Sequence, residues 1–124
     1  FPDTIETLQY LKERGYTMHL ITNGFEKTQH SKLQSCNLQQ YFTHVVTSEG
    51  SNSLKPQAEI FEYAMAKAKT TAAKSMMIGD SVEIDILGAQ SVGMDSVHVN
   101  YLHKLQSIKP TYTIYHLKEL QNIL

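Results

Sequence analysis

Short apolar runs alternate along the chain with longer stretches of helical periodicity. Apolar residues spaced three apart predict a first helix over residues 3–14, with Pro2 just before it. Asp3 and Glu6 have the spacing of a capping box, and Gly15 is typical of a helix end. We therefore expect a capped helix at the start of the chain.

The remaining elements continue this alternation. Short apolar runs bounded by turn residues predict strands, and amphipathic stretches predict helices between them. The polar segment 48–55, rich in serine, asparagine and glycine, predicts a loop. The expected strands cover residues 17–22, 44–47, 75–78, 96–99 and 112–114, and the expected helices cover residues 26–35, 57–69, 83–92 and 117–124.

Strands that alternate with helical connections favour right-handed crossovers and a mostly parallel sheet covered on both faces. The sequence thus predicts an α/β fold. The 124 residues suit one domain and are too few for a second full one. A hydrophobic content of 41% and a charged content of 19% are typical of a chain that folds.

Charge and cysteine content exclude several functional classes. A formal charge of -1 lacks the positive field of a nonspecific nucleic-acid binder. Cys36, the one cysteine, has no disulfide partner and no zinc-ligand spacing, and we expect it to be a buried thiol. No apolar run approaches the ~20 residues of a membrane helix, and no signal pattern opens the sequence. These features favour a cytoplasmic protein without a membrane or nucleic-acid polymer as partner.

Four polar residues follow predicted strands or the loops after them, where open parallel sheets bind ligands. Thr22 offers a hydroxyl and Lys55 a compact positive charge, which suit a phosphate group. Asp80 offers an oxygen ligand for Mg²⁺, and Asp85 either joins it or orients Lys55. Each residue alone also fits an ordinary turn, cap or surface role, so their shared position carries the prediction of a phosphoryl-transfer site.

Three segments carry a resemblance to a known family. They are Leu20–Phe25 (LITNGF), Leu54–Pro56 (LKP) and Met77–Asp85 (MIGDSVEID). In order and spacing they resemble motifs two, three and four of the haloacid dehalogenase superfamily. The closing segment Pro110–Leu124 is similar to the end of its capped phosphatases, especially the pyrimidine 5′-nucleotidase branch.

The resemblance implies a Rossmann-like three-layer sandwich and Mg²⁺-dependent hydrolysis of phosphate monoesters through an aspartyl-phosphate. The substrate would be a phosphorylated small molecule, with a nucleotide as one candidate. Thr22, Lys55 and Asp80 would be catalytic. By the resemblance, phosphate binding belongs to Thr22, Asn23, Gly24 and Lys55, and metal binding to Asp80 and Asp85.

One motif of the family is absent from the chain. Its first motif lies on the central strand and supplies the nucleophile and the general acid/base; Asp3–Thr7 is superficially similar, but it opens a helix. The cap of the family is absent as well. We therefore expect residues 1–124 to be a single partial core domain, inactive alone, whose sheet is completed by an N-terminal segment or a second copy unless its free edges collapse together. The alternative is a noncatalytic fragment, or a phosphate-binding or subunit-interaction domain of the same fold.

Overall fold

The computed structural model describes residues 3–124, so the predicted place of Pro2 lies outside the described residues. All five expected strands are present; helical segments connect the first four, whereas β4 leads to β5 through residues 100–111 without a helix. No helix among the described residues is long and apolar enough to cross a membrane. The strands are β1 (His19–Thr22), β2 (His44–Thr47), β3 (Met76–Gly79), β4 (Asp95–Val99) and β5 (Tyr112–Ile114). The α-helices are α1 (Thr4–Glu13), α2 (Glu26–Ser35), α3 (Ser48–Ser51), α4 (Ala58–Ala68) and α5 (Leu87–Ser91).

Four tighter or wider helical turns complete the chain. Three are 3₁₀ turns: η1 (Gln39–Tyr41), η2 (Ala72–Lys74) and η4 (Leu117–Asn122). The fourth, η3 (Val82–Ile86), is a π-helical turn that runs directly into α5. The predicted helix 83–92 is therefore two helical types in succession, and the predicted last helix is a 3₁₀ turn.

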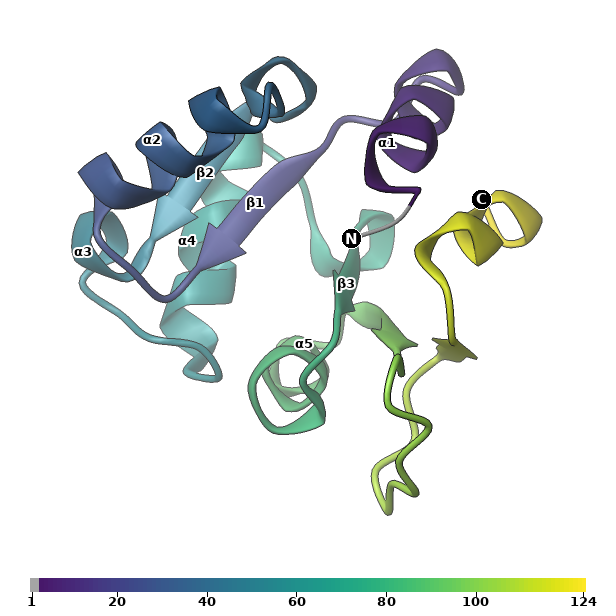
Figure 1. Cartoon of the computed structure of the whole chain (residues 1–124). Helices are drawn as coiled ribbons and strands as arrows, with labels where there is room; N and C mark the ends of the chain where they lie inside the picture. Colours follow the sequence, from purple (N-terminus) through teal and green to yellow (C-terminus); the bar gives the residue numbers. More distant parts are fainter. Residues whose placement is uncertain (1–2) are drawn as a thin grey trace.

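The strands form two parallel sheets, which confirms the α/β class. β1 pairs with β2, and β3, β4 and β5 form the second sheet in that order. Every pairing between the described strands is parallel. β1 and β3 do not pair with each other, so each keeps one free edge, and Figure 1 shows no strand between them. The two edges have not collapsed into one ladder.

One hydrophobic core spans both sheets. Ile21 of β1 and Val46 of β2 pack in the same cluster as Met77 of β3. Phe61 of α4 and Ala89 of α5 are fully buried in this cluster. Side-chain packing therefore joins the two sheets where backbone hydrogen bonds do not.

A second core lies over the three-stranded sheet. Leu11 of α1 and Leu120 of η4 are buried against Val97 of β4. The hydroxyl of Tyr10 lies 3.2 Å from the carbonyl oxygen of Gln121, to which it donates. The first and last helical elements thus lie side by side, as Figure 1 shows in purple and yellow.

The segment Ser48–Lys55 is not entirely a loop, because its first four residues form α3. The hydroxyl of Thr47 accepts a hydrogen bond from the backbone N–H of Gly50 at 2.9 Å. The hydroxyl of Ser51 donates to the carbonyl oxygen of Thr47 at 2.7 Å. An N-cap threonine therefore starts a helical turn in a segment whose composition predicted a loop.

Two further predictions from the sequence are wrong. Asp3 precedes α1, but its carboxylate makes no capping hydrogen bond, because its φ of 66° is left-handed instead of the extended conformation of a cap. The capping box lies instead at η4, between His116 and Glu119. Cys36 is exposed at the end of α2. That helix has a polar sequence and buries only Leu33, so the end of the helix does not place Cys36 in an apolar environment.

Candidate active site

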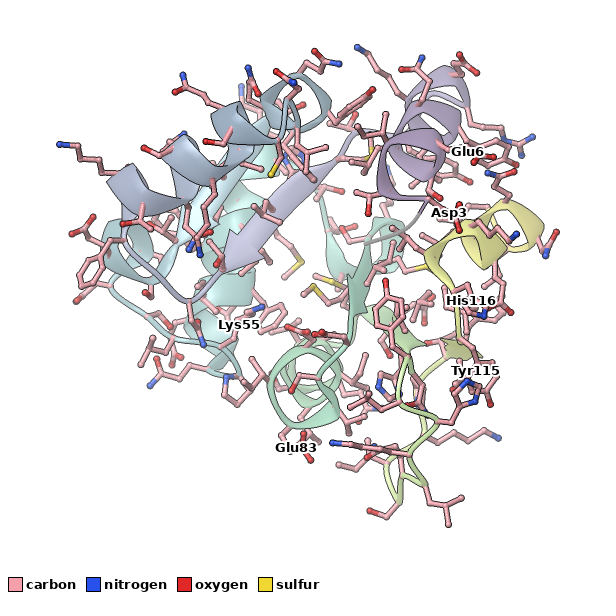
Figure 2. All side chains as sticks on the ribbon, in the orientation of Figure 1. Asp3, Glu6, Lys55, Glu83, Tyr115 and His116 are labelled. Atoms are coloured by element: carbon pink, nitrogen blue, oxygen red, sulfur yellow. The ribbon has the colours of Figure 1, made fainter. Side chains whose placement is uncertain are left out.

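An ion pair joins the ends of the two sheets. Lys55 lies in the loop between α3 and α4, and its Nζ lies 2.7 Å from Oδ1 of Asp85, in the π-helical turn after β3. The two side chains are 13% and 7% exposed. Oδ2 of Asp85 also accepts the backbone N–H of Ser81 at 3.3 Å. In the view of Figure 2, Lys55 lies between α4 and α5.

Asp85 reaches this position because β3 ends in a glycine. A methyl group on Gly79 would overlap the carboxylate of Asp85, so only the bare Cα leaves the space. The carboxylate therefore packs directly against the end of β3. Position 79 therefore has to be a glycine for the carboxylate of Asp85 to fit.

The side chain of Asn23 holds the backbone of Lys55. Its Oδ1 accepts the backbone N–H of Lys55 at 2.8 Å, and its Nδ2 donates to the carbonyl oxygen of Lys55 at 3.2 Å. The Lys55–Pro56 peptide bond is cis. Asn23, which was predicted to bind phosphate, therefore uses both polar atoms of its side chain to hold the backbone of Lys55.

The loop after β1 is held from β2. The hydroxyl of Ser48 accepts the N–H of Gly24 at 2.9 Å and donates to the carbonyl oxygen of Gly24 at 3.0 Å. The hydroxyl of Thr22, by contrast, makes no hydrogen bond to any residue in the described range 3–124, and the residue is half-buried. The loop shape is thus fixed while the Thr22 hydroxyl stays available for a ligand. Sequence reasoning missed Ser48, although it directly follows a strand.

Asp80 follows β3 and is exposed. Nε2 of His98, a residue of β4 that is 3% exposed, lies 3.3 Å from the carbonyl oxygen of Asp80. Because a carbonyl only accepts, this nitrogen carries the proton. Burial, and then the negative charge of Asp80, raise the pKa of the Tyr101 phenol, which places Tyr101 within electrostatic reach of the site. The sequence alone indicated neither contact.

The described residues fit part of a Mg²⁺ site. No group of three or more histidine, cysteine, aspartate or glutamate side chains within residues 3–124 could hold a metal ion. Mg²⁺, however, usually keeps several waters and takes only one or two carboxylates beside phosphate oxygens. The exposed carboxylate of Asp80 suits such a ligand, whereas both oxygens of Asp85 already have partners in Lys55 and Ser81. Of the two roles expected for Asp85, the structure contains the ion pair with Lys55.

A hydroxyl, an ammonium and a carboxylate thus lie at the carboxyl ends of parallel strands. The parallel strands and the helices around them define an α/β protein of Rossmann-like architecture. The family model of the haloacid dehalogenase-like hydrolases matches residues 1–99. The chain belongs to this family, which confirms the resemblance seen in its motifs.

Curated relatives of the chain are phosphatases and nucleotidases. The chain is 38% identical over 100 residues to a glyceraldehyde 3-phosphate phosphatase of Methanothermobacter thermautotrophicus, covering 81% of this chain and 44% of the relative. It is 37% identical over 108 residues to the pyrimidine 5′-nucleotidase YjjG of Escherichia coli, covering 85% of this chain and 48% of that protein. The chain therefore spans about half the length of the curated relatives it matches.

Solved structures show the same fold. A HAD phosphatase from Thermococcus onnurineus superposes with a TM-score of 0.94 at 36% identity, over 99% of this chain and 57% of that one. The YfnB protein of Bacillus subtilis, solved bound to magnesium, superposes with a TM-score of 0.94 at 30% identity, over 99% of this chain and 55% of its own. The predicted Rossmann-like class is thereby confirmed.

Proposed function

We propose that the intact protein is a Mg²⁺-dependent phosphomonoester hydrolase. The observation that supports the proposal is the shielded ion pair between Lys55 and Asp85, which holds an ammonium against the turn that follows β3. A salt bridge that only stabilises the fold could lie anywhere in the protein. An ammonium that neutralises a transferring phosphoryl group has to lie at the strand ends, where the ligand binds. The names of the relatives as phosphatases support the same chemistry.

Each residue has a distinct task in this proposal. The hydroxyl of Thr22 donates a hydrogen bond to a phosphate oxygen. The ammonium of Lys55, oriented by Asp85, offsets negative charge on the phosphate and on the attacking group. The carboxylate of Asp80 holds Mg²⁺, which when bound polarises the phosphoryl oxygens. Gly24 and Asn23 shape the loop around the phosphate through Ser48 and Lys55.

The nucleophile belongs to a strand outside this chain. β1 and β3 each keep a free edge, and an added parallel strand would pair with both. An N-terminal segment of the intact protein is the proposed source, with a second copy as the alternative. Its aspartate oxygen would bond to phosphorus while the ester oxygen takes a proton from the general acid of the same strand and leaves as the alcohol. Water, which gives its proton back to that group, would then attack phosphorus and release phosphate and the free aspartate.

The proposed substrate is a phosphorylated small molecule, with a nucleotide as one candidate. Relatives named for a triose phosphate and for pyrimidine nucleotides support this class. We propose no nucleic-acid polymer or membrane as partner, since the chain carries a formal charge of -1. An exposed free thiol at Cys36 suits the reducing cytoplasm.

The test is hydrolysis by the intact protein. We expect it to release phosphate from para-nitrophenyl phosphate in Mg²⁺ and to stop when EDTA is added. A panel of nucleoside monophosphates and triose phosphates then ranks the substrates by kcat/KM. Residues 1–124 expressed alone should release none. Phosphate binding by the intact protein without turnover would overturn the enzyme proposal and favour a phosphate-binding domain.

A further inference from the structure

We propose that Asn23 is a positioning residue that acts through Lys55: its amide sets the backbone of Lys55, and thereby places the lysine ammonium on Asp85. The catalytic meaning of that placement rests on the proposed function, but the mechanical link does not. The two hydrogen bonds between the amide and the Lys55 backbone, at 2.8 and 3.2 Å, are its basis.

The loop that carries Lys55 has few other anchors. Within residues 52–57, Gln57 accepts hydrogen bonds from Ser53 and from the backbone of Leu54, both at 2.9 Å. The backbone N–H of Gln57 donates to Leu54. These bonds keep the loop compact, but they lie within it and do not attach it to β1.

Two attachments therefore fix Lys55 relative to the sheets. Among the described residues, two side chains outside the loop hydrogen-bond its backbone. Ser51, the last residue of α3, donates to the carbonyl oxygen of Ser53 at 3.2 Å, and Asn23 bonds to Lys55 itself. The second attachment is the bond from the Lys55 ammonium to Asp85 at 2.7 Å. Asn23 comes from the end of β1 and Asp85 from the turn after β3, so Lys55 is held from both sheets.

This role differs from phosphate binding by Asn23. The amide presents both its oxygen and its nitrogen to one peptide unit, which is a geometry that orients a backbone. Loss of the amide would let the backbone of Lys55 shift, and a lysine side chain that shifts loses its fixed contact with a shielded carboxylate. Asn23 and Asp85 share no hydrogen bond in the described structure, and Lys55 is bonded to both, so we expect the energetic coupling between them to pass through Lys55.

The test is a double-mutant cycle in the intact protein, read out by thermal melting. Asn23→Leu removes both amide bonds at similar volume, and Asp85→Asn removes the ionic partner. We expect the two shifts in melting temperature to add to more than the shift of the double variant. In a Lys55→Met background this coupling should vanish. Asn23→Asp, which keeps the acceptor for the Lys55 N–H, should melt between Asn23→Leu and the unchanged protein.

The matched control is Ser48→Ala, which removes the neighbouring tie on Gly24 without touching Lys55. Its shift should add to that of Asp85→Asn. Additive shifts for Asn23→Leu and Asp85→Asn would overturn the positioning role, whatever the activity of the protein.

A kinetic readout adds the catalytic consequence. Asn23→Leu should lower kcat by about 10-fold with a smaller change in KM, since displacing a catalytic group by a fraction of an ångström to 1 Å is costly. The same substitution should lower kcat no further once Lys55 is methionine. A protein without turnover would overturn the proposed function and leave the melting cycle fully interpretable.

Discussion

The ammonium of Lys55 and the carboxylate of Asp85 meet across the two sheets in a site largely closed to water. Two charges in such a place have lost most of their hydration and depend on each other. Removing one partner leaves the other charged and unpaired, whereas replacing both with apolar residues leaves no buried charge. The stability of the protein should therefore respond very differently to the two kinds of change.

We expect Asp85→Ala to lower the free energy of unfolding by about 3 kcal/mol. The paired variant Lys55→Met with Asp85→Leu should lose less than half of that. Equilibrium unfolding in urea without substrate measures both. Equal losses for the single and paired variants would show that the ion pair is not desolvated.

Asp80→Asn in the intact protein should lower kcat by ~10²-fold or more, because an amide replaces the charged oxygen ligand beside the phosphate. Steady-state hydrolysis of para-nitrophenyl phosphate in Mg²⁺ measures the loss. Glu83→Gln is the matched control, since it neutralises an exposed acid in the π-helical turn that follows Asp80 and should change kcat little. Near-normal turnover by Asp80→Asn would remove Asp80 from the site.

Lys55→Ala should reduce kcat/KM more than Thr22→Ala does. The ammonium offsets charge on two groups, whereas the hydroxyl contributes one hydrogen bond worth about 1–3 kcal/mol to an ionic acceptor. Parallel measurement of kcat/KM for the two variants gives the ranking. The reverse order would mean that charge neutralisation by Lys55 is not the larger effect.

Gly88→Ala should destabilise the core, because a methyl group on Gly88 would overlap the ring of Phe61. Phe61 is fully buried and has no room to withdraw, and overpacking of this kind costs about 1–3 kcal/mol. Thermal melting measures the loss. Adding Phe61→Leu should make the double variant more stable than the sum of the single losses predicts; simple additivity would contradict the contact.

The stability of the fold should fall on mild acidification because of His19. Its ring stacks on His44 with centroids 5.2 Å apart, and its Nδ1 is buried without a partner among the described residues. Burial, and then the charge of His44, lower the pKa of His19 below the ordinary value of 6.5. In the unfolded chain His19 takes up its proton near that ordinary value, so the unfolded state binds more protons as the pH falls.

Melting temperatures recorded from about pH 7.5 to pH 5.5 should therefore decline through the ordinary histidine range and level off below the lowered pKa. His19→Gln should remove part of the decline. His30→Gln, on the exposed side of α2, should leave it unchanged. An identical decline in all three proteins would assign it to other groups.

Much of the fold could be predicted from local pattern. The strands His44–Thr47 and Tyr112–Ile114 and the helix Glu26–Ser35 have the predicted bounds, because turn residues or changes of periodicity mark both ends. The predicted strand 17–22 is two residues too long: Met18 accepts a backbone hydrogen bond from Thr43, but the strand ladder begins only at His19. Pairing partners, which the sequence does not display, set that boundary.

The site was predicted less completely. Residues that follow strands could be identified because all parallel strands point the same way, and Lys55 and Asp85 do meet there. The clamp from Asn23 joins residues 32 positions apart, and the bond from His98 to Asp80 depends on the register of β3 against β4. Such contacts follow from the tertiary arrangement. The roles of Thr22, Asn23, Gly24, Lys55, Asp80 and Asp85 toward phosphate and metal stay predictions.

The free edges of β1 and β3 bear on how the molecule is assembled. Within residues 3–124, apolar side chains and the ion pair between Lys55 and Asp85 join the two sheets, and the sheets share no strand ladder. A strand that enters between β1 and β3 would break no ladder hydrogen bond among the described residues. Such a strand could pair residue by residue, and each added residue would form ladder hydrogen bonds with the free edge of β1 or of β3.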